Sequence, residues 1–404
     1  MKRLVLKFGG TSVGTVEKIK KVANIVKKRF SEGNEIIVVL SAMSGVTNEL
    51  KAKSDLISKN FDSKELDTLL SSGEQASCAL LSGVLIDLGI KARTWLGWQI
   101  PILTNENHTS SQIINIKTDE ISNFISKKGI AVISGFQGVS KEMRITTLGR
   151  GGSDLSAVAI AKFFKTDSCE IYTDVDGVFT ADPFISEKAK KIEKISYEEM
   201  LEMSSLGAKV MQPNAVQLSM IDNIPIHVRS TFLENSGTKI TNESEIENTK
   251  VVTSIAYSKG NAKISIIGVV DKPGVAADIF EPIAQNNINV DMVIQNTSMD
   301  GKNANITFTI KQEDLNKTVN IIEKNKQKFN YNKITHDDKL AKVSIIGAGM
   351  ISESGVTHKM FRSLADEKIN ILAISTSEIK ISVLIKEELT QKSVKTLHKA
   401  FGLN

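Results

Sequence analysis

The chain has 404 residues, of which 41% are hydrophobic and 24% charged, and its formal net charge is +5. This length allows two or three domains, since a domain typically holds roughly 100 to 200 residues, and the composition is that of a soluble globular protein. The lysines are spread along the whole chain and do not cluster with aromatic residues, which argues against a nucleic-acid partner. The mild positive charge suits an anionic substrate.

The two cysteines, Cys78 and Cys169, are too few for a disulfide framework, and neither lies at metal-ligand spacing from another Cys or a His. The first residues lead directly into an apolar run and a glycine turn, so we expect no signal peptide. No run of about 18 apolar residues would span a membrane. We therefore expect a cytoplasmic protein without a membrane partner.

A glycine turn near the start of the chain joins a predicted strand to a predicted helix. Residues 4–6 form an apolar run typical of a buried parallel strand, Lys7-Phe8-Gly9-Gly10 follows, and apolar residues then recur at helical spacing from about 15 to 30. In open α/β sheets, ligands bind beyond the carboxyl ends of the strands, where glycines expose N–H groups to an anion. Residues 7–10 either bind phosphate in this way or only form a tight turn.

Apolar runs that predict buried strands recur at 36–40, 130–134, 170–173 and 225–228, with helical patterns between them. This alternation predicts an α/β fold with a mostly parallel sheet sandwiched by helices. Functional side chains are then expected at the ends of the strands.

Two polar segments fit either ligand binding or a role at a helix end. Residues 41–47, SAMSGVT, place the hydroxyls of Ser41 and Thr47 after the second predicted strand, where they also suit helix capping. Residues 71–75, SSGEQ, are predicted to open a helix. Glu74 would then be a first-turn carboxylate that complements the helix dipole or binds a ligand.

Residues 146–154, TTLGRGGSD, contain three glycines in four positions around Arg150 and precede a helix predicted at about 155–165. Such a segment is costly to order unless something must lie close to its backbone. Arg150 offers a planar fork for a carboxylate or phosphate, and Ser153 and Asp154 lie where a helix N-terminus would receive or orient one. We therefore favour a functional interpretation over helix capping alone.

A further polar segment, residues 173–183, reads TDVDGVFTADP and follows a predicted strand. Its carboxylates could help to hold a nucleotide or its magnesium, although the same residues are common in turns. Lys209, after a predicted helix, is a possible second cation for phosphates.

Several well-known nucleotide motifs are absent. The chain has no G-x-x-x-x-G-K-[ST] loop and neither an H-R-D nor a D-F-G motif, which excludes those two designs for phosphoryl transfer. Gly347 and Gly349 follow a predicted strand, but Ser352 stands where a dinucleotide-binding turn has its third glycine, so we reject that interpretation.

Taken together, KFGGTSVG, SAMSGVT, SSGEQ, TTLGRGGSD, TDVDGVFTADP and GAKVMQP resemble the aspartate kinases of the amino acid kinase family, and they occur in the family's order. The resemblance implies transfer of the γ-phosphoryl group of MgATP to the side-chain carboxylate of L-aspartate. The product, 4-phospho-L-aspartate, leads to lysine, threonine, methionine and isoleucine. The implied cofactors are ATP and Mg²⁺, the latter bound mainly through the nucleotide.

The resemblance also implies roles for single residues. The implied catalytic residues are Lys7, Asp154 and Lys209. The implied ATP-binding residues are Lys7, Phe8, Gly9, Gly10, Thr173, Asp174, Phe179, Asp182, Pro183 and Lys209. The implied aspartate-binding residues are Ser41, Thr47, Glu74, Arg150, Ser153 and Asp154. Two positions depart from the family's pattern: Phe184 replaces a frequent basic residue, and Gln212 replaces a frequent His.

The C-terminal third contains an internal repeat. AKISIIG at 262–268 is echoed by AKVSIIG at 341–347, and KPGVAADIF at 272–280 by ESGVTHKMF at 353–361. Each unit predicts a strand, a glycine turn, a helix, a strand and a hairpin. The polar stretch 234–248 before the repeat is expected to be a linker.

The repeated units resemble paired ACT domains, small βαββαβ modules that bind amino acids beside biosynthetic enzymes. The resemblance implies feedback inhibition by lysine and/or threonine; the alternative is a module that only dimerises. The implied effector residues are Asp271, Lys272, Gly274, Val275, Ala276, Asn289, Val290 and Gln295 in the first unit and Met350, Ile374, Ser375 and Thr376 in the second. Exposed sheet edges in such units favour pairing, so we expect a homo-oligomer.

The predicted organisation is a catalytic domain at 1–240, a linker at 241–260, and ACT-like units at 261–335 and 336–404. Two alternatives to an aspartate kinase stay open. One is a non-catalytic amino-acid sensor on a kinase-like scaffold, and the other is a relative that phosphorylates glutamate or another acid.

Overall fold

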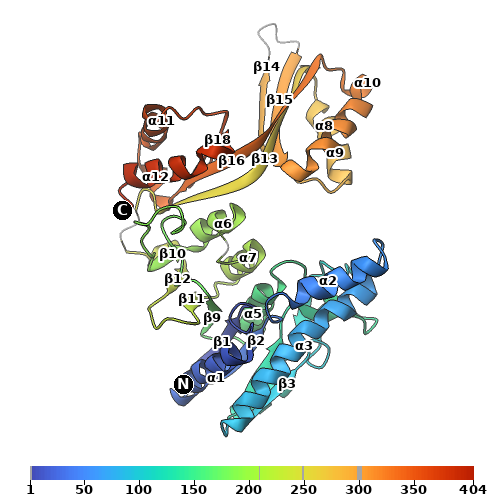
Figure 1. Ribbon diagram of the computed structural model, residues 1–404, viewed down its shortest axis with the longest axis vertical. Helices are drawn as coiled ribbons and strands as arrows, with labels where there is room; N and C mark the ends of the chain where they lie inside the picture. The colour runs from blue at the N-terminus through green and yellow to red at the C-terminus, as the bar shows by residue number, and fades with distance from the viewer. Residues whose placement is uncertain (1, 209, 248–249, 298–302) are drawn as a thin grey trace. The chain divides into compact units, whose positions relative to one another are not determined.

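A computed structural model describes residues 2–208, 210–247, 250–297 and 303–404 (Figure 1). The described residues form two compact units. The first comprises the described residues of Met1–Val178, Lys191–Ser205 and Lys209–Asn248. The second comprises Phe179–Lys190, Leu206–Ala208 and the described residues of Thr249–Asn404.

The first unit is built on an eight-stranded sheet with the order β10-β12-β11-β9-β1-β2-β6-β3, in which the described pairs are parallel except for β11 and β12. A smaller sheet has the order β5-β4-β7-β8. The strands are β1 (Arg3–Phe8), β2 (Glu35–Leu40), β3 (Ala92–Trp95), β4 (Ile102–Thr104), β5 (Ile113–Ile116), β6 (Ile130–Ser134), β7 (Gln137–Val139), β8 (Ile145–Thr147), β9 (Ser168–Thr173), β10 (Lys194–Ser196), β11 (Ile226–Ser230) and β12 (Thr238–Thr241). The predicted α/β fold with a mostly parallel sheet is confirmed.

Helices cover the large sheet on both faces. Alternate residues of β1 and β2, such as Leu6 and Val38, pack against α1 and α3, and the residues between them, such as Val5 and Ile37, are also buried. Helix α5 lies against β1 and β9. The helices are α1 (Val16–Ser31), α2 (Val46–Ile57), α3 (Ser63–Asp87), α4 (Asp119–Ser126), α5 (Gly152–Phe163), α6 (Tyr197–Ser205) and α7 (Pro213–Ile221), with a 3-10 turn η1 (Glu243–Glu245).

Three local expectations need correction. Residues 71–75 do not open a helix, because α3 already begins at Ser63, where the Asp62 side chain caps it. Lys7 and Phe8 belong to strand β1 and not to the turn after it. The polar stretch 234–248 contains β12, whose residue Ile240 is fully buried between β10 and β11, so the stretch is partly sheet.

Helix α3 is long and apolar enough by length and composition to cross a membrane, but half of its most apolar window is buried inside the molecule. It also carries the buried carboxyl groups of Asp67 and Glu74. These features are those of a helix in the core of a globular protein.

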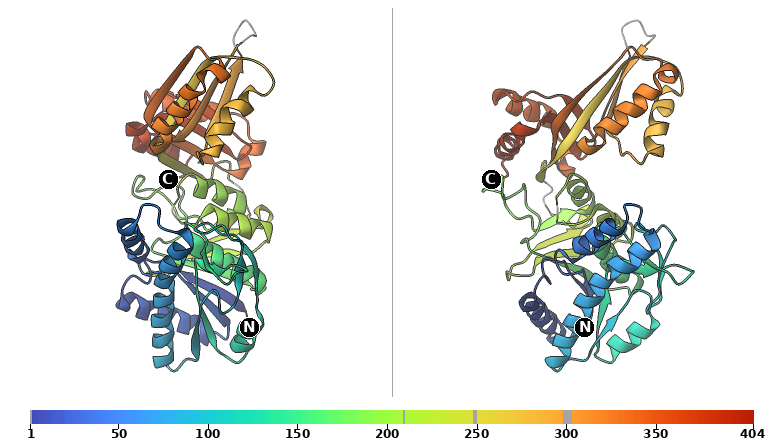
Figure 2. Two further views of the ribbon diagram at one scale, coloured as in Figure 1. Left: turned by 90° about the vertical axis from the view of Figure 1, so that its right-hand side faces the viewer. Right: turned by 45° about the vertical axis from the view of Figure 1, so that its right-hand side comes forward.

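The second unit contains a six-stranded antiparallel sheet with the order β14-β15-β13-β16-β18-β17. Helices flank different parts of this sheet (Figure 2). The strands are β13 (Ser254–Val270), β14 (Asp291–Thr297), β15 (Asn303–Lys311), β16 (Lys333–Ile346), β17 (Ala373–Thr376) and β18 (Lys380–Lys386). The helices are α8 (Val275–Gln285), α9 (Leu315–Lys324), α10 (Lys326–Phe329), α11 (Val356–Asp366) and α12 (Thr390–Ala400), with 3-10 turns η2 (Gln312–Asp314), η3 (Ala348–Ser352) and η4 (Glu387–Leu389).

Strand β13 contributes to two hydrophobic cores. Its second half, with Ile264 and Ile266, packs with α8 and β15. Its first half pairs with the end of β16, and Ile255 packs with α11 and α12. A strand segment that precedes the repeat in the sequence therefore completes the core of the second repeat.

Candidate active site

The glycine turn after β1 is held between the ends of two neighbouring strands. The Gly9 N–H donates to the Tyr172 carbonyl (3.3 Å), and the Phe8 ring stacks on the Tyr172 ring with centroids 4.6 Å apart. A Cβ atom on Gly10 would lie 2.8 Å from the Ala42 carbonyl oxygen. A side chain at residue 10 would therefore push the turn away from segment 41–47.

Lys7, the penultimate residue of β1, forms a buried ion pair with Asp154 in the first turn of α5. The Lys7 Nζ and Asp154 Oδ1 atoms are 2.6 Å apart, and the two side chains are only 11% and 10% exposed. The position of Asp154 near the start of α5 also favours its negative charge through the helix dipole. The pair fixes a cation at the carboxyl end of the central strand.

The glycines around Arg150 are required by the backbone. Gly149 and Gly151 both have φ = 74°, in the left-handed region that favours glycine. A Cβ atom on Gly151 would also lie only 1.9 Å from Cγ of Gln212. Arg150 is exposed, and its guanidinium has no hydrogen-bond or ion-pair partner among the described residues. The loop thus presents an unpaired cation.

Glu74 lies in the middle of α3 and is 3% exposed. Its Oε1 atom accepts a hydrogen bond from the Ala42 N–H (2.9 Å), whereas the buried Oε2 atom has no partner among the described residues. Burial raises the pKa of Glu74 to about 7, although the bond from Ala42 opposes this shift. One carboxylate oxygen is therefore left available for a donor on a ligand.

Asp67 is a supporting residue that the sequence did not reveal. It is fully buried and binds the His108 ring through Nδ1 (2.6 Å), the Thr109 N–H (3.1 Å) and the Thr147 hydroxyl (2.5 Å). It thereby ties α3 to the start of the Arg150 loop. No local signal marks it, because the buried side of α3 that carries Asp67 and Glu74 also carries Ser71, Ser77 and Ser82.

These groups converge on a cavity of about 320 Å³. It is lined by residues from β1, the 41–47 segment, α3, the turn before β7, the segment 149–154 and the residue before α7, stretches that lie far apart in the sequence. The lining residues are Lys7, Ser41, Thr47, Glu74, Phe136, Gly149, Arg150, Gly151, Gly152, Ser153, Asp154 and Gln212. All six residues predicted for substrate binding are among them.

The remaining predicted nucleotide residues lie elsewhere. Thr173 ends β9 and Asp174 follows it, and the Thr173 hydroxyl donates to the Asp174 carboxylate (3.1 Å). Phe179, Asp182 and Pro183 belong to the second unit. Lys209 lies outside the described residues.

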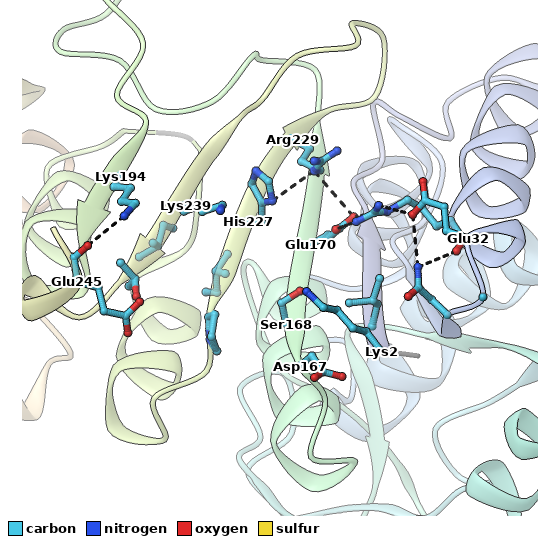
Figure 3. Close-up of a pocket in the computed structure, with 18 residues that line it drawn as sticks. Lys2, Glu32, Asp167, Ser168, Glu170, Lys194, His227, Arg229, Lys239 and Glu245 are labelled. Atoms are coloured by element: carbon cyan, nitrogen blue, oxygen red, sulfur yellow. Dashed lines mark hydrogen bonds and ion pairs between the residues drawn. The ribbon is translucent and has the colours of Figure 1, made fainter. Parts of the chain in front are cut away.

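A larger cavity of about 870 Å³ lies over the first residues of β1, β9 and β11 (Figure 3). Its central carboxylate, Glu170, is 2% exposed and forms an ion pair with the Arg29 guanidinium. Glu170 also accepts a hydrogen bond from the Tyr172 hydroxyl (2.8 Å). The Arg229 Nε atom donates to Nδ1 of His227 (3.4 Å), and burial lowers the pKa of His227. None of the predicted site residues that the structure describes lines this cavity, and its arginines already have partners. The smaller cavity is therefore the candidate active site.

The predicted effector residues lie in the second unit. Asp271 and Lys272 follow β13, and Gly274 (φ = 93°) precedes α8. Val275 and Ala276 begin α8, and Met350 lies in η3. The remaining effector positions are near or on the two edge strands of the sheet: Asn289 and Val290 precede β14, Gln295 is exposed on β14, and Ile374, Ser375 and Thr376 lie on β17. A small core of Met292, Leu340 and Leu384, with Leu372 and Ala373 against it, brings β14 close to β17. Their role in effector binding stays a prediction.

Comparison with known proteins shows the family of this chain. The family model of the amino acid kinase family matches residues 2–230, and an ACT domain model matches residues 264–325 and 343–401. The aspartate kinase of Pseudomonas putida is 44% identical over 405 residues, covering 100% of this chain and 98% of that protein. Aspartokinase 2 of Bacillus subtilis is 42% identical over 401 residues, covering 99% of this chain and 98% of that protein. The crystal structure of Clostridium acetobutylicum aspartate kinase, at 25% identity, has a TM-score of 0.81 and covers 98% of this chain and 100% of that chain.

The chain therefore belongs to the amino acid kinase family and carries a C-terminal ACT region. Within that family, its full-length relatives place it among the aspartate kinases, and it is an ATP-dependent enzyme.

The raised pKa of Glu74 predicts a pH-dependent stability. Because the folded state holds this proton more tightly than the unfolded chain, Glu74 lowers the free energy of unfolding as pH rises from about 4.5 to about 7, by about 3 kcal/mol. Urea unfolding at pH 5 and pH 7.5 should therefore show that Glu74→Gln loses less stability than the wild type across this range. Glu65→Gln, at an exposed position of α3, is the matched control and should behave as the wild type. An identical pH dependence in all three proteins would contradict the prediction.

Proposed function

We propose that this aspartate kinase transfers the γ-phosphoryl group of MgATP to the side-chain carboxylate of L-aspartate. The product is 4-phospho-L-aspartate, and the reaction is the first step toward lysine, threonine, methionine and isoleucine. The observation that carries the proposal is the convergence of an ion-paired Lys7, an unpaired Arg150 and a half-paired Glu74 in one cavity.

The proposed substrate contacts follow from the charges in the cavity. Arg150 can bind a carboxylate of aspartate through two parallel N–H donors. The free Oε2 atom of Glu74 can accept from the substrate ammonium, and such an ion pair favours the ionised form of this carboxyl group. The hydroxyls of Ser41, Thr47 and Ser153 line the same space and can complete the hydrogen bonds of the substrate.

The proposed catalysis is mainly electrostatic. Phosphoryl transfer requires positioning and neutralisation of negative charge, and a carboxylate nucleophile needs no general base at neutral pH. Lys7 would face the phosphates, with Asp154 holding its ammonium group in place, and the small residues Gly9 and Gly10 would let a phosphate approach the backbone of the turn. Phe8, Thr173, Asp174, Phe179, Asp182, Pro183 and Lys209 complete the proposed nucleotide-binding set.

Magnesium enters the proposal with the nucleotide. Among the described residues, no group of three or more His, Cys, Asp or Glu side chains is placed to hold a metal ion. We therefore assign Mg²⁺ mainly to the phosphate oxygens of ATP, where it would offset their charge.

The proposed reaction predicts an acyl phosphate product. With MgATP and aspartate, trapping by hydroxylamine should yield the hydroxamate, whereas glutamate should give much less. Activity only with glutamate would favour the relative with another substrate, and tight amino-acid binding without nucleotide turnover would favour the non-catalytic sensor.

Lys7→Ala should lower kcat on the order of 100-fold, since it removes a charge that stabilises the transition state. Lys21→Ala, on the exposed face of α1, is the control, and a kcat retained in Lys7→Ala would remove Lys7 from the reacting phosphoryl group.

Arg150→Lys should raise KM for aspartate by about tenfold, because a point charge cannot replace a planar fork that binds a carboxylate through two bonds. Initial rates at varied aspartate concentration measure this change. The matched control is Arg144→Lys, since Arg144 pairs with Glu65 outside the cavity and should leave KM unaltered. Equal KM values in both variants would exclude Arg150 from the aspartate site.

We further propose that lysine and/or threonine inhibits the enzyme through the ACT region, that the active form is a homo-oligomer joined by that region, and that the enzyme is cytoplasmic. The match of an ACT domain model to two segments supports an amino-acid effector. The edge strands β14 and β17 offer surfaces for pairing with a second copy.

Gln295→Ala should relieve inhibition without changing the uninhibited rate, because Gln295 is exposed on the edge strand β14 and outside the catalytic cavity. Initial rates with lysine, threonine and both together measure the effect. Asn296→Ala is the matched control, because neighbouring residues of a strand point to opposite faces. Full inhibition of Gln295→Ala by every effector would move the regulatory site elsewhere.

A further inference from the structure

The segment Phe179–Lys190 carries part of the predicted nucleotide site and belongs to the second unit. Side chains that the sequence analysis did not single out anchor it to the rest of that unit. It contains no regular helix or strand. Ala181 and Ile185 are nonetheless buried, in the core that also contains Ile255 and Leu397. The segment therefore depends for its conformation on the ACT region.

The first anchor is the hydroxyl of Tyr257 on strand β13. It donates to Oδ2 of Asp182 (2.9 Å), while Oδ1 of Asp182 accepts the Phe184 N–H (2.9 Å) and closes a turn. Both carboxylate oxygens are thus engaged within the second unit. Burial, and then Asp182 itself, raises the pKa of Tyr257 to about 12, which agrees with a phenol held to a carboxylate.

The second anchor is His398 of α12, which is 1% exposed. Its Nε2 atom lies 2.9 Å from the Thr180 hydroxyl, and its Nδ1 atom lies 2.9 Å from Oδ1 of Asn404. The Thr180 hydroxyl also accepts the Lys190 N–H (3.0 Å). A neutral imidazole protonated on Nδ1 satisfies all three bonds, since Thr180 then donates to Nε2 and Nδ1 donates to Asn404.

A backbone bond between these two anchors fixes the segment to the sheet. The Ile255 N–H, two residues before Tyr257, donates to the Thr180 carbonyl (2.8 Å). Thr180 is therefore held through its hydroxyl by α12 and through its carbonyl by β13. Phe179 and Asp182, two of the predicted nucleotide residues, lie one and two positions from it.

We propose that Tyr257 and His398 are positioning residues for ATP: they touch no substrate themselves, and they fix the nucleotide segment Phe179–Pro183 in its binding conformation. This inference rests on the proposed function, because the nucleotide role of that segment is part of it. It assigns a share of the ATP affinity to two residues of the second unit, whereas the proposed aspartate contacts come from the first unit.

The test compares Tyr257→Phe with Tyr331→Phe in the full-length protein. Tyr331 is buried in the second unit, whereas Tyr257 is partly buried there, and no hydrogen bond of the Tyr331 hydroxyl is found within the described residues. The Tyr331 variant therefore controls for loss of a phenol hydroxyl from this unit. Tyr257→Phe should raise KM for ATP on the order of tenfold, the typical weight of one lost hydrogen bond, and leave kcat and KM for aspartate within about twofold. Thr180→Val keeps the side-chain volume and removes the hydrogen bond between the Thr180 hydroxyl and His398. It should also raise KM for ATP.

Two results would overturn the inference. One is an unchanged KM for ATP in both Tyr257→Phe and Thr180→Val. The other is a Tyr257→Phe variant whose KM values for ATP and aspartate change equally and whose thermal midpoint lies well below that of Tyr331→Phe. That result would indicate that Tyr257 has only a structural role.

Amide hydrogen exchange separates this inference from the proposed function. If the wild type showed no ATP-dependent phosphorylation, the proposed function would fail, but the anchoring could still be measured. Tyr257→Phe should speed exchange in the peptide 179–190 relative to Tyr331→Phe. Unchanged exchange in that peptide would reject the positioning role even for an active enzyme.

Discussion

The buried ion pair between Lys7 and Asp154 is the interaction on which the catalytic unit depends. Removing two charges from water is costly, and the cost is offset only when the partners lie close and their remaining bonding capacity is satisfied. The pair meets the first condition with a 2.6 Å contact, and the start of α5 favours the carboxylate. It joins the central strand to the helix that follows the Arg150 loop, so the sheet and the loop share one electrostatic anchor.

The importance of the glycines in the Arg150 loop could be predicted from the sequence, because it follows from the local backbone conformation. Gly149 and Gly151 have a backbone conformation that most residues avoid, and their clustering around Arg150 showed that the loop is unusual. The parallel sheet was also predictable, since buried strands leave continuous apolar runs. Glu74 was assigned to the site through the resemblance to the family, but its helix was placed wrongly, because SSGEQ looks like a helix start and α3 begins at Ser63.

Other features were hidden because they depend on contacts between distant residues. Asp67 has no local signature, and its role arises only when His108 and Thr147 fold onto α3. The repeat suggested two successive units, yet β13 enters both cores, because its first half pairs with the end of β16. A sequence repeat shows only that its copies are similar. It gives no information about a strand that pairs with a distant part of the chain.

Strand β13 also runs from the anchor of the proposed nucleotide segment to the predicted effector residues. Tyr257 lies near its start, and its last residue, Val270, precedes the predicted effector residues Asp271 and Lys272. The ladder is irregular around Gly260 (φ = 68°), where the register shifts on pairing with β16. Coupling through this path requires that effector and nucleotide favour different arrangements of the strand, and a ligand bound equally by both arrangements would shift neither. Because the proposed role of the segment that Tyr257 anchors is to bind ATP, small changes in that segment would change the ATP affinity without any contact with aspartate.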